Sequence, residues 1–230
     1  MRINQYLAHK GFSTRRGADL LITQKLVQLN GKIARLGDKV SAGDIVVVSP
    51  AVINKIENSY RYVAYNKPRG ISTDQPKEGE SIKMSLPSLR GLFSLGRLDK
   101  DSQGLLILTN DGRLTNRILS PDQVHEKEYV VKVDKIITDK FIRHLERGVL
   151  IETYKTKPAR ANRIGETIFR ITLTEGKKHQ IRRMCAAEGY CVLELTRTRI
   201  MNIKLGDLKE GAYRKIIGAE LAELKKSIGL

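Results

Sequence analysis

The sequence has no tryptophan, only two cysteines and only four histidines among its 230 residues. Cys185 and Cys191 are too few to form a disulfide framework in a chain of this length, so we expect a pair of thiols in the core. No Cys-x-x-Cys or His-x-x-x-His spacing indicates a metal site. No run approaches the roughly 20 apolar residues of a membrane span, and the first residues lack the apolar core of a signal peptide. The sequence therefore predicts a cytoplasmic protein without a metal.

Acidic residues are scarce relative to basic ones. The chain has 42 Lys and Arg against 25 Asp and Glu, which gives a formal net charge of +17. Its 40% of hydrophobic residues is typical of a folded globular protein rather than a disordered one. Such a charge favours a polyanionic partner, and nucleic acid is the first expectation. A membrane surface is disfavoured because the basic residues are spread along the chain and no strongly amphipathic basic helix stands out.

The first 50 residues have the pattern of a small separate domain. Two short amphipathic helices are predicted, the second of them capped by Ser13 or Thr14. Asn30 and Gly31 stand between two alternating segments, which is the strongest short signal for a β-hairpin. This segment holds eight Lys and Arg against three Asp, a net charge of +5. Because residues 51–58 resemble a polar linker, we predict domains at residues 1–50 and 59–230.

The second domain contains several strand patterns with single helices between them. Strands are predicted at residues 61–65, 104–109, 129–133 and 169–173 from their apolar runs or alternation. One helix is expected after Asp111 and Gly112, and another from about Lys178 to Glu188. Since strict repetition of strand, helix and strand is missing, the pattern indicates an α+β protein with a mixed sheet and helices on its faces.

Two polar segments of this domain have the residue types of a reaction site. Asp99 follows a strand-like run in which Arg97 and Asp99 are expected on the same face, although a carboxylate in a loop is more often a turn former. We give Asp101 and Asp111 that structural interpretation. The second segment, residues 175–184, starts a basic helix with His179 and Arg182 on one face, where anions are favoured. A solvated basic face is an equally good interpretation of that helix taken alone.

Together these segments resemble the RsuA-type pseudouridine synthases, most of all the RluF-like enzymes that modify large-subunit ribosomal RNA. The similarity covers nearly the whole chain. The N-terminal segment is similar to the alpha-L RNA-binding module through Ser13-Thr14-Arg15-Arg16 and Leu29-Asn30-Gly31. The synthase motifs are matched by Asn66-Lys67-Pro68-Arg69-Gly70, Gly96-Arg97-Leu98-Asp99, Lys127-Glu128-Tyr129 and His179-Gln180-Ile181-Arg182-Arg183-Met184.

The resemblance implies an isomerase that converts uridine in RNA to its carbon-linked isomer without a cofactor. It implies a mixed, mainly antiparallel sheet flanked by helices, preceded by the RNA-binding module. Asp99 takes the role of the catalytic carboxylate, either as nucleophile at the ribose or as base for its 2′ proton, and Arg182 is expected to pair with it. Tyr129 is expected to pack against the target base, although a lone tyrosine in a strand is usually a core residue. One apolar side chain near the site is also implied, with Ile200, Met201 and Leu205 as candidates.

The expected partner is ribosomal RNA, with transfer RNA or small-subunit RNA as alternatives, and the expected state is a monomer. A competing hypothesis is a non-catalytic RNA-binding assembly factor, which the net charge supports equally but which leaves the carboxylate of Asp99 unexplained. A hydrolytic carboxylate pair of Asp99 with Glu175 or Asp111 is weaker, because nothing fixes their separation and water attack would release free uracil. The residues expected to bind RNA are Arg15, Arg16, Lys32, Arg97, Lys178, His179, Arg183, Arg197 and Arg199.

Overall fold

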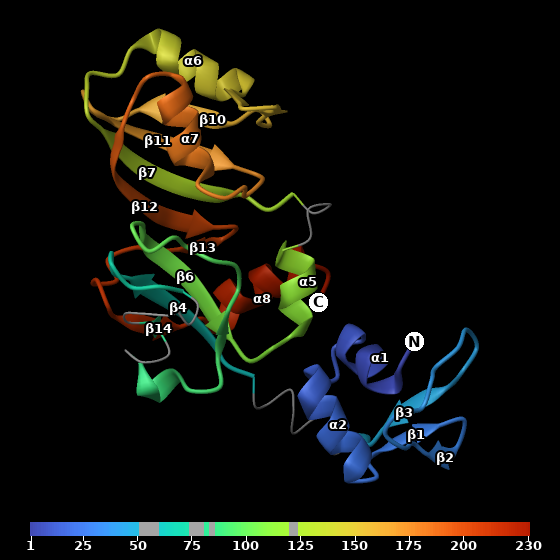
Figure 1. Cartoon of the computed structure of the whole chain (residues 1–230). Helices are drawn as coiled ribbons and strands as arrows, with labels where there is room; N and C mark the ends of the chain where they lie inside the picture. The colour runs from blue at the N-terminus through green and yellow to red at the C-terminus, as the bar shows by residue number, and fades with distance from the viewer. Residues whose placement is uncertain (51–59, 74–80, 83–85, 120–123) are drawn as a thin grey trace.

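The computed structural model of the chain describes residues 1–50, 60–73, 81–82, 86–119 and 124–230. A small N-terminal module stands beside a larger domain built on one long sheet (Figure 1). The expected linker at residues 51–58 lies outside the described residues, so the domain boundaries stay predictions.

The N-terminal module has the predicted order of two helices, a hairpin and a strand. Thr14 caps the second helix, since its Oγ1 accepts a hydrogen bond of 3.1 Å from the backbone N–H of Gly17. The hairpin turn has positive φ at both Asn30 (51°) and Gly31 (78°), as a tight hairpin of matching twist requires. The elements are α1 Ile3–His9, α2 Arg15–Thr23, β1 Val27–Leu29, β2 Lys32–Ile33 and β3 Val46–Val48.

The larger domain contains, within the described ranges, a nine-stranded sheet with the path β10-β11-β7-β12-β6-β4-β14, to which β13 and β5 add at β12 and β6. The pairing of β12 with β6 is parallel and the other pairings are antiparallel, which confirms the mixed, mainly antiparallel sheet. The strands are β4 Tyr62–Lys67, β5 Phe93–Ser94, β6 Gln103–Thr109, β7 Lys127–Val133, β10 Arg160–Arg163, β11 Ile168–Leu173, β12 Val192–Ile200, β13 Ile203–Lys204 and β14 Tyr213–Lys215.

Helices cover this sheet in two groups, and a short hairpin lies beside the second group. Helices α5 and α8 pack on the half with β4 and β6, whereas α6 and α7 pack on the half with β7, β11 and β12 (Figure 1). The opposite face of β4 and β6 packs against the segment around η1. The bounds are η1 Pro87–Leu89, α5 Arg113–Leu119, α6 Asp139–Arg147, β8 Leu150–Ile151, β9 Tyr154–Lys155, α7 Gln180–Ala187 and α8 Gly218–Ser227.

A small polar joint connects the module to the larger domain. The Tyr60 hydroxyl donates a hydrogen bond of 3.2 Å to the carbonyl of Gly11, and the guanidinium of Arg113 lies 4.5 Å from the Tyr60 ring centroid. Asp111, which is fully buried, binds that guanidinium through two hydrogen bonds. The turn-forming interpretation of Asp111 therefore fits the structure, because its carboxylate also accepts the N–H of Arg113 at the start of α5.

The two cysteines differ, and the expectation of two core thiols is wrong for one of them. Cys185 is buried on the inner face of α7, where burial raises the pKa of its thiol to about 12. Cys191 is exposed because it immediately precedes Val192, whose side chain points inward at the start of β12. Across the described residues, His, Cys, Asp and Glu form no group of three that could hold a metal ion. None of the helices described is long and apolar enough to cross a membrane.

Candidate active site

A pocket of about 430 Å³ lies where the two halves of the sheet meet. The segment before β6, strands β7 and β12 and the start of α7 contribute its walls. Asp99 and Tyr129 both line it, so the structure brings these two predicted residues together. The other lining residues are Leu95, Gly96, Arg97, Leu98, Ser102, Ile118, Lys127, Tyr154, Lys157, Leu173, Thr174, Glu175, Gly176, Lys177, Lys178, His179, Gln180, Ile181, Leu195, Arg197 and Ile200.

Asp99 stands on a loop that backbone hydrogen bonds hold in place. The N–H of Ser102 donates to the Asp99 carbonyl at 3.0 Å, which closes the loop into a turn. The Thr73 hydroxyl donates a hydrogen bond of 2.6 Å to the carbonyl of Leu98, the residue before Asp99, and accepts one of 3.2 Å from its N–H. The side chain of Asp99 is 40% exposed. The carboxylate is thus fixed through its backbone while one side remains open to a ligand.

His179 lies beside this carboxylate. Its Nε2 lies 3.5 Å from Oδ1 of Asp99 and forms an ion pair when the imidazole is protonated. His179 also explains why α7 begins at Gln180 rather than at Lys178 as predicted. It has φ of +52°, which is left-handed backbone that cannot continue a right-handed helix.

Arg182 does not form the expected ion pair with Asp99. Its Nη1 donates to the carbonyl of Val192 at 3.0 Å, and its Nη2 donates to the carbonyl of Asp101 at 2.9 Å. The guanidinium therefore ties α7 and β12 to the loop that carries Asp99, two residues beyond the carboxylate. The expectation of a direct pair is wrong in this structure, where hydrogen bonds to the carbonyls of Val192 and Asp101 orient the guanidinium.

Tyr129 reaches the pocket because of the alternation of β7. Lys127 and Tyr129 point to one face, and Glu126 and Glu128 contact residues on the other face. Tyr129 is partly buried against the core that Ile171 and its neighbours form, so its ring is one wall of both core and pocket.

Ile200 is the one of the three apolar candidates that lines the pocket. Met201 and Leu205 pack instead against the core of the β4 and β6 half. Together with Leu173, Leu195 and Ile181, Ile200 gives the pocket an apolar wall opposite the polar loop of Asp99. Such a wall excludes water from a bound base.

Two buried cations lie behind the loop, and sequence reasoning missed the role of both. Lys67 is fully buried and donates from Nζ to the carbonyls of Pro68 and Ile71 at 2.8 and 2.7 Å. Burial, and secondly the charge of Arg197, lower its pKa to about 8. The available signal was the position of Lys67 at the end of a predicted apolar strand and directly before Pro68.

Arg197 is the second buried cation, with only 3% of the residue exposed. Its Nε donates to the carbonyl of Leu105 at 2.7 Å and its Nη1 to the carbonyl of Arg97 at 3.2 Å. Its Nη2 is buried and has no hydrogen-bond partner in the part of the chain that the structure describes. Arg197, which we expect to bind RNA, thus lies in the pocket wall rather than on the exposed surface.

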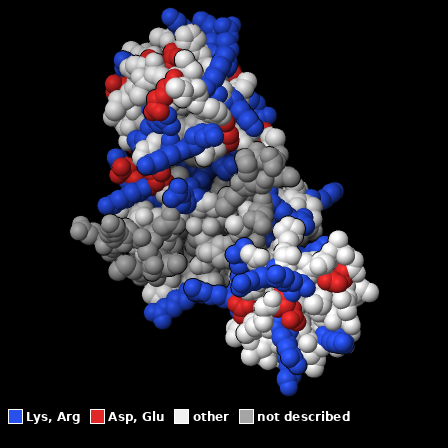
Figure 2. All heavy atoms as spheres, turned by 45° about the vertical axis from the view of Figure 1, so that its right-hand side comes forward, with Lys and Arg blue, Asp and Glu red and all other residues white. Residues whose placement is uncertain are grey.

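Six of the remaining predicted RNA-binding residues are exposed, and Arg183 and Arg199 are partly buried. Lys and Arg are spread over both the N-terminal module and the larger domain (Figure 2). Arg183 forms an ion pair of 2.9 Å with Glu152, and Arg199 forms one of 3.1 Å with Glu126. The exposed members of the predicted set are Arg15, Arg16, Lys32, Arg97, Lys178 and His179.

Neither carboxylate proposed for a hydrolytic pair is available for one. Glu175 does line the pocket, but it accepts hydrogen bonds from Gln180 Nε2 (2.6 Å), the N–H of Lys157 (3.0 Å) and the Tyr154 hydroxyl. These bonds organise the loop that presents the basic start of α7. Asp111 is buried in the joint described above. Asp99 is thus the carboxylate of the pocket that is open to a ligand.

Comparisons with known proteins agree with this site. Residues 61–187 match the model of the RNA pseudouridylate synthase family, and residues 1–46 match the S4 domain. The chain is 45% identical over 229 residues to the dual-specificity RNA pseudouridine synthase RluF of Salmonella typhi, covering 99% of this chain and 79% of the relative. It is 35% identical to the ribosomal large subunit pseudouridine synthase B of Bacillus subtilis, covering 97% and 95%. A crystal structure of a pseudouridylate synthase superposes with a TM-score of 0.71 at 30% identity, covering 99% of each chain.

Proposed function

The chain belongs to the RNA pseudouridylate synthase family, and from that premise we propose that it converts specific uridines of ribosomal RNA to pseudouridine with Asp99 as the essential carboxylate. The reaction breaks the glycosidic bond, rotates the uracil and joins its carbon 5 to the ribose. The observation that carries the proposal is the position of Asp99, open to a ligand at the edge of a pocket with an apolar wall and a basic rim.

Each part of the pocket has a task in that reaction. Asp99 attacks the ribose or removes its 2′ proton, and His179 lies 3.5 Å from its carboxylate at the edge of the pocket. The ring of Tyr129 and the side chain of Ile200 hold the detached base dry until it recombines. Arg182 keeps the loop of Asp99 against α7 and β12 through its two carbonyl bonds.

Large-subunit ribosomal RNA is the target that we propose. The relative from Bacillus subtilis is named for the large subunit, and the similarity to the RluF enzyme extends over almost all of this chain. A uridine inside folded RNA must leave its stack to reach Asp99. The exposed cations Arg97 and Lys178 at the rim would hold the phosphates on either side of the flipped nucleotide.

The N-terminal module positions the RNA in this proposal and takes no part in the chemistry. We place its boundary at residue 50 and that of the catalytic domain at residue 59, and we propose a monomer that acts in the cytoplasm. Arg15, Arg16 and Lys32 are exposed and supply contacts to the RNA backbone.

The test is to map pseudouridines in total RNA from cells that carry the wild-type chain, the Asp99→Asn variant or no copy of the gene. We expect one or a few sites in large-subunit RNA to disappear in the last two. Purified Asp99→Asn should bind the RNA that contains the site with unchanged affinity, because the substitution keeps shape and basic surface. Sites in small-subunit or transfer RNA would correct the proposed target. An Asp99→Asn variant that still restores the sites would remove Asp99 from the chemistry and leave the assembly-factor hypothesis.

A further inference from the structure

Two arginines of β12 lie two residues apart yet point to opposite faces of the sheet. In a regular strand residues i and i+2 share a face. Here Arg197 is paired in register with Tyr129, and Arg199 is paired with Glu128, so β12 advances two residues while β7 advances one. Thr198 is therefore the additional residue of a β-bulge, which inverts the alternation from this point onward.

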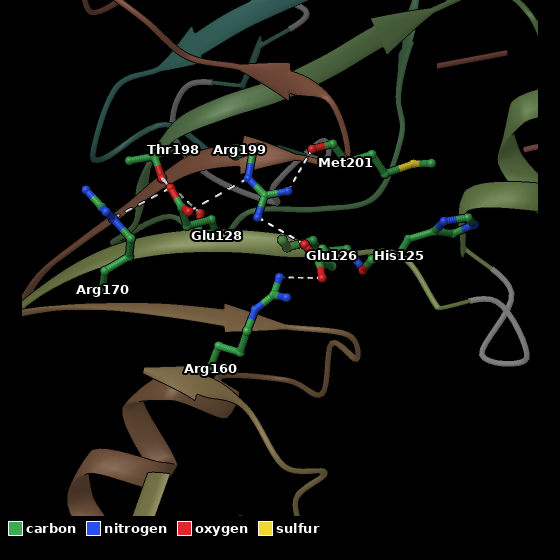
Figure 3. Close-up of polar contacts among 9 residues, drawn as sticks. His125, Glu126, Glu128, Arg160, Arg170, Thr198, Arg199 and Met201 are labelled. Carbon is green, nitrogen blue, oxygen red and sulfur yellow. Dashed lines mark hydrogen bonds and ion pairs between the residues drawn. The ribbon is translucent and has the colours of Figure 1, made fainter. Parts of the chain in front are cut away.

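The bulge separates Arg197 and Arg199 onto opposite faces of the sheet. Its guanidinium enters the pocket wall, where Nη1 binds the carbonyl of Arg97, two residues before Asp99. Arg199 faces away from the pocket, where it contacts Glu126 and Glu128 and donates to the carbonyl of Met201 at 2.8 Å (Figure 3). Without the inversion the two guanidinium groups would share one face, and one of these two sets of contacts would be lost.

A single carboxylate holds the bulge in place. The Thr198 hydroxyl donates to Oε1 of Glu128 at 2.8 Å, and Nε of Arg199 lies 3.7 Å from Oε2 of the same residue. Arg170 adds a third contact to this carboxylate, an ion pair with Nε at 3.8 Å from Oε1 of Glu128 (Figure 3). Glu128 thus binds both the additional residue of the bulge and the residue that follows it.

We infer that Glu128 and Thr198 are positioning residues for the isomerisation: they hold the β12 bulge, the bulge keeps Arg199 on the face opposite to Arg197, and Arg197 in the pocket wall fixes the loop of Asp99. The inference rests on the proposed function, because it assigns these residues to the same site. Neither residue lines the pocket, so their effect passes through Arg197. The chain of contacts from Glu128 to the loop consists of the hydrogen bonds of Thr198 and Arg197 given above.

The experiment compares two substitutions of Thr198, one that keeps its hydrogen bond to Glu128 and one that removes it. Thr198→Val keeps the branched shape and loses the donor, whereas Thr198→Ser keeps the donor. We expect Thr198→Val and Glu128→Gln to lower the single-turnover rate on the target RNA about tenfold, the value of one hydrogen bond. Their RNA affinity should stay within about twofold of wild type, and Thr198→Ser should restore most of the rate.

Glu194→Gln is the matched control. Glu194 pairs with Lys132 at 3.0 Å across the same two strands, but their side chains are 54% and 43% exposed and the pair makes no contact with Thr198 among those given above. We expect its rate and affinity to equal those of wild type. Equal rates for Thr198→Val and wild type would overturn the inference. Parallel losses of rate and RNA affinity in Thr198→Val, Glu128→Gln and Glu194→Gln would also overturn it.

Hydrogen exchange of the loop separates this inference from the proposed function. The amide of Ser102, which is bonded to the Asp99 carbonyl, should exchange faster in Thr198→Val than in wild type or Thr198→Ser. This measurement needs no RNA and no activity. Unchanged exchange would overturn the inference even if pseudouridine is formed, and faster exchange would support it even if the target RNA proves to be a different one.

Discussion

The pocket and the N-terminal module are both rich in cations but hold them in different ways. In the module, Arg15, Arg16 and Lys32 are exposed on a small helical and hairpin surface. At the pocket and behind its loop, Arg197 and Lys67 are buried and donate hydrogen bonds to backbone carbonyls. Exposed cations bind phosphates and add affinity that depends on salt, whereas buried cations fix the backbone around them. The comparison predicts that changes in the pocket alter rate or stability, and changes in the module alter affinity.

Tyr129 provides the strongest way to break this comparison. Tyr129→Leu removes the ring that would stack on the flipped base, and we expect it to abolish turnover while RNA affinity changes little. Tyr129→Phe keeps the ring and loses the hydroxyl. General base catalysis contributes about 10² to 10⁴ to a rate. If the hydroxyl removes the proton from carbon 5, this variant should stall after the uracil has been rejoined to the ribose. Single-turnover assays with product analysis measure both effects, and full activity in both variants would return Tyr129 to the core.

Lys67 sharpens the comparison through stability. Its pKa is about 8 in the folded chain against 10.5 for a free lysine, so the unfolded chain binds more protons between these values. Folding stability should therefore rise with pH from 8 to 10.5, and below pH 8 the buried charge costs about 3 kcal/mol. Lys67→Met should lack this rise. Unfolding of both proteins by denaturant at several pH values measures the difference, and parallel curves would mean that Lys67 titrates as an exposed lysine does.

Much of the fold could be predicted because its signals are local. The Asn30-Gly31 turn requires positive φ at both residues, and the sequence offers the two residue types that accept it. The apolar run of β6 and the alternation of β7 likewise depend on neighbouring residues alone. The start of α7 was misplaced because the residue types around His179 do not indicate the left-handed backbone that it adopts.

The errors at the site have a common cause in contacts between distant segments. Arg182 was expected at Asp99, but it donates to the carbonyls of Val192 and Asp101. A sequence does not show which backbone carbonyls the fold brings next to a side chain. Arg197 and Arg199 were both predicted to bind RNA, and regular alternation would place them on one face. The bulge at Thr198 reverses that, and a bulge depends on the register of two strands that are far apart in the chain.

Arg182→Lys tests whether a cation beside the pocket acts by binding backbone carbonyls. Lysine keeps the charge, but one ammonium group cannot span the two carbonyls that the planar guanidinium bridges. We expect the single-turnover rate to fall about tenfold, with affinity within about twofold. Arg183→Lys is the matched control, since Arg183 makes an exposed ion pair with Glu152 and should tolerate the change. Equal small effects at both positions would make α7 a solvated basic helix.

Arg15 and Arg16 give the smallest effect and test the other side of the comparison. The double substitution Arg15→Gln with Arg16→Gln should weaken RNA binding several-fold at moderate salt and leave the single-turnover rate at saturating RNA unchanged. Each phosphate contact contributes about 0.7 to 0.9 to the slope of log affinity against log salt, so the slope should fall by about 1.4 to 1.8. The control is Lys140→Gln with Arg143→Gln, which removes the same charge from exposed positions on α6 outside the proposed RNA contacts. If both double variants change the slope equally, the module contributes only general charge, and the division between binding and positioning cations would not hold.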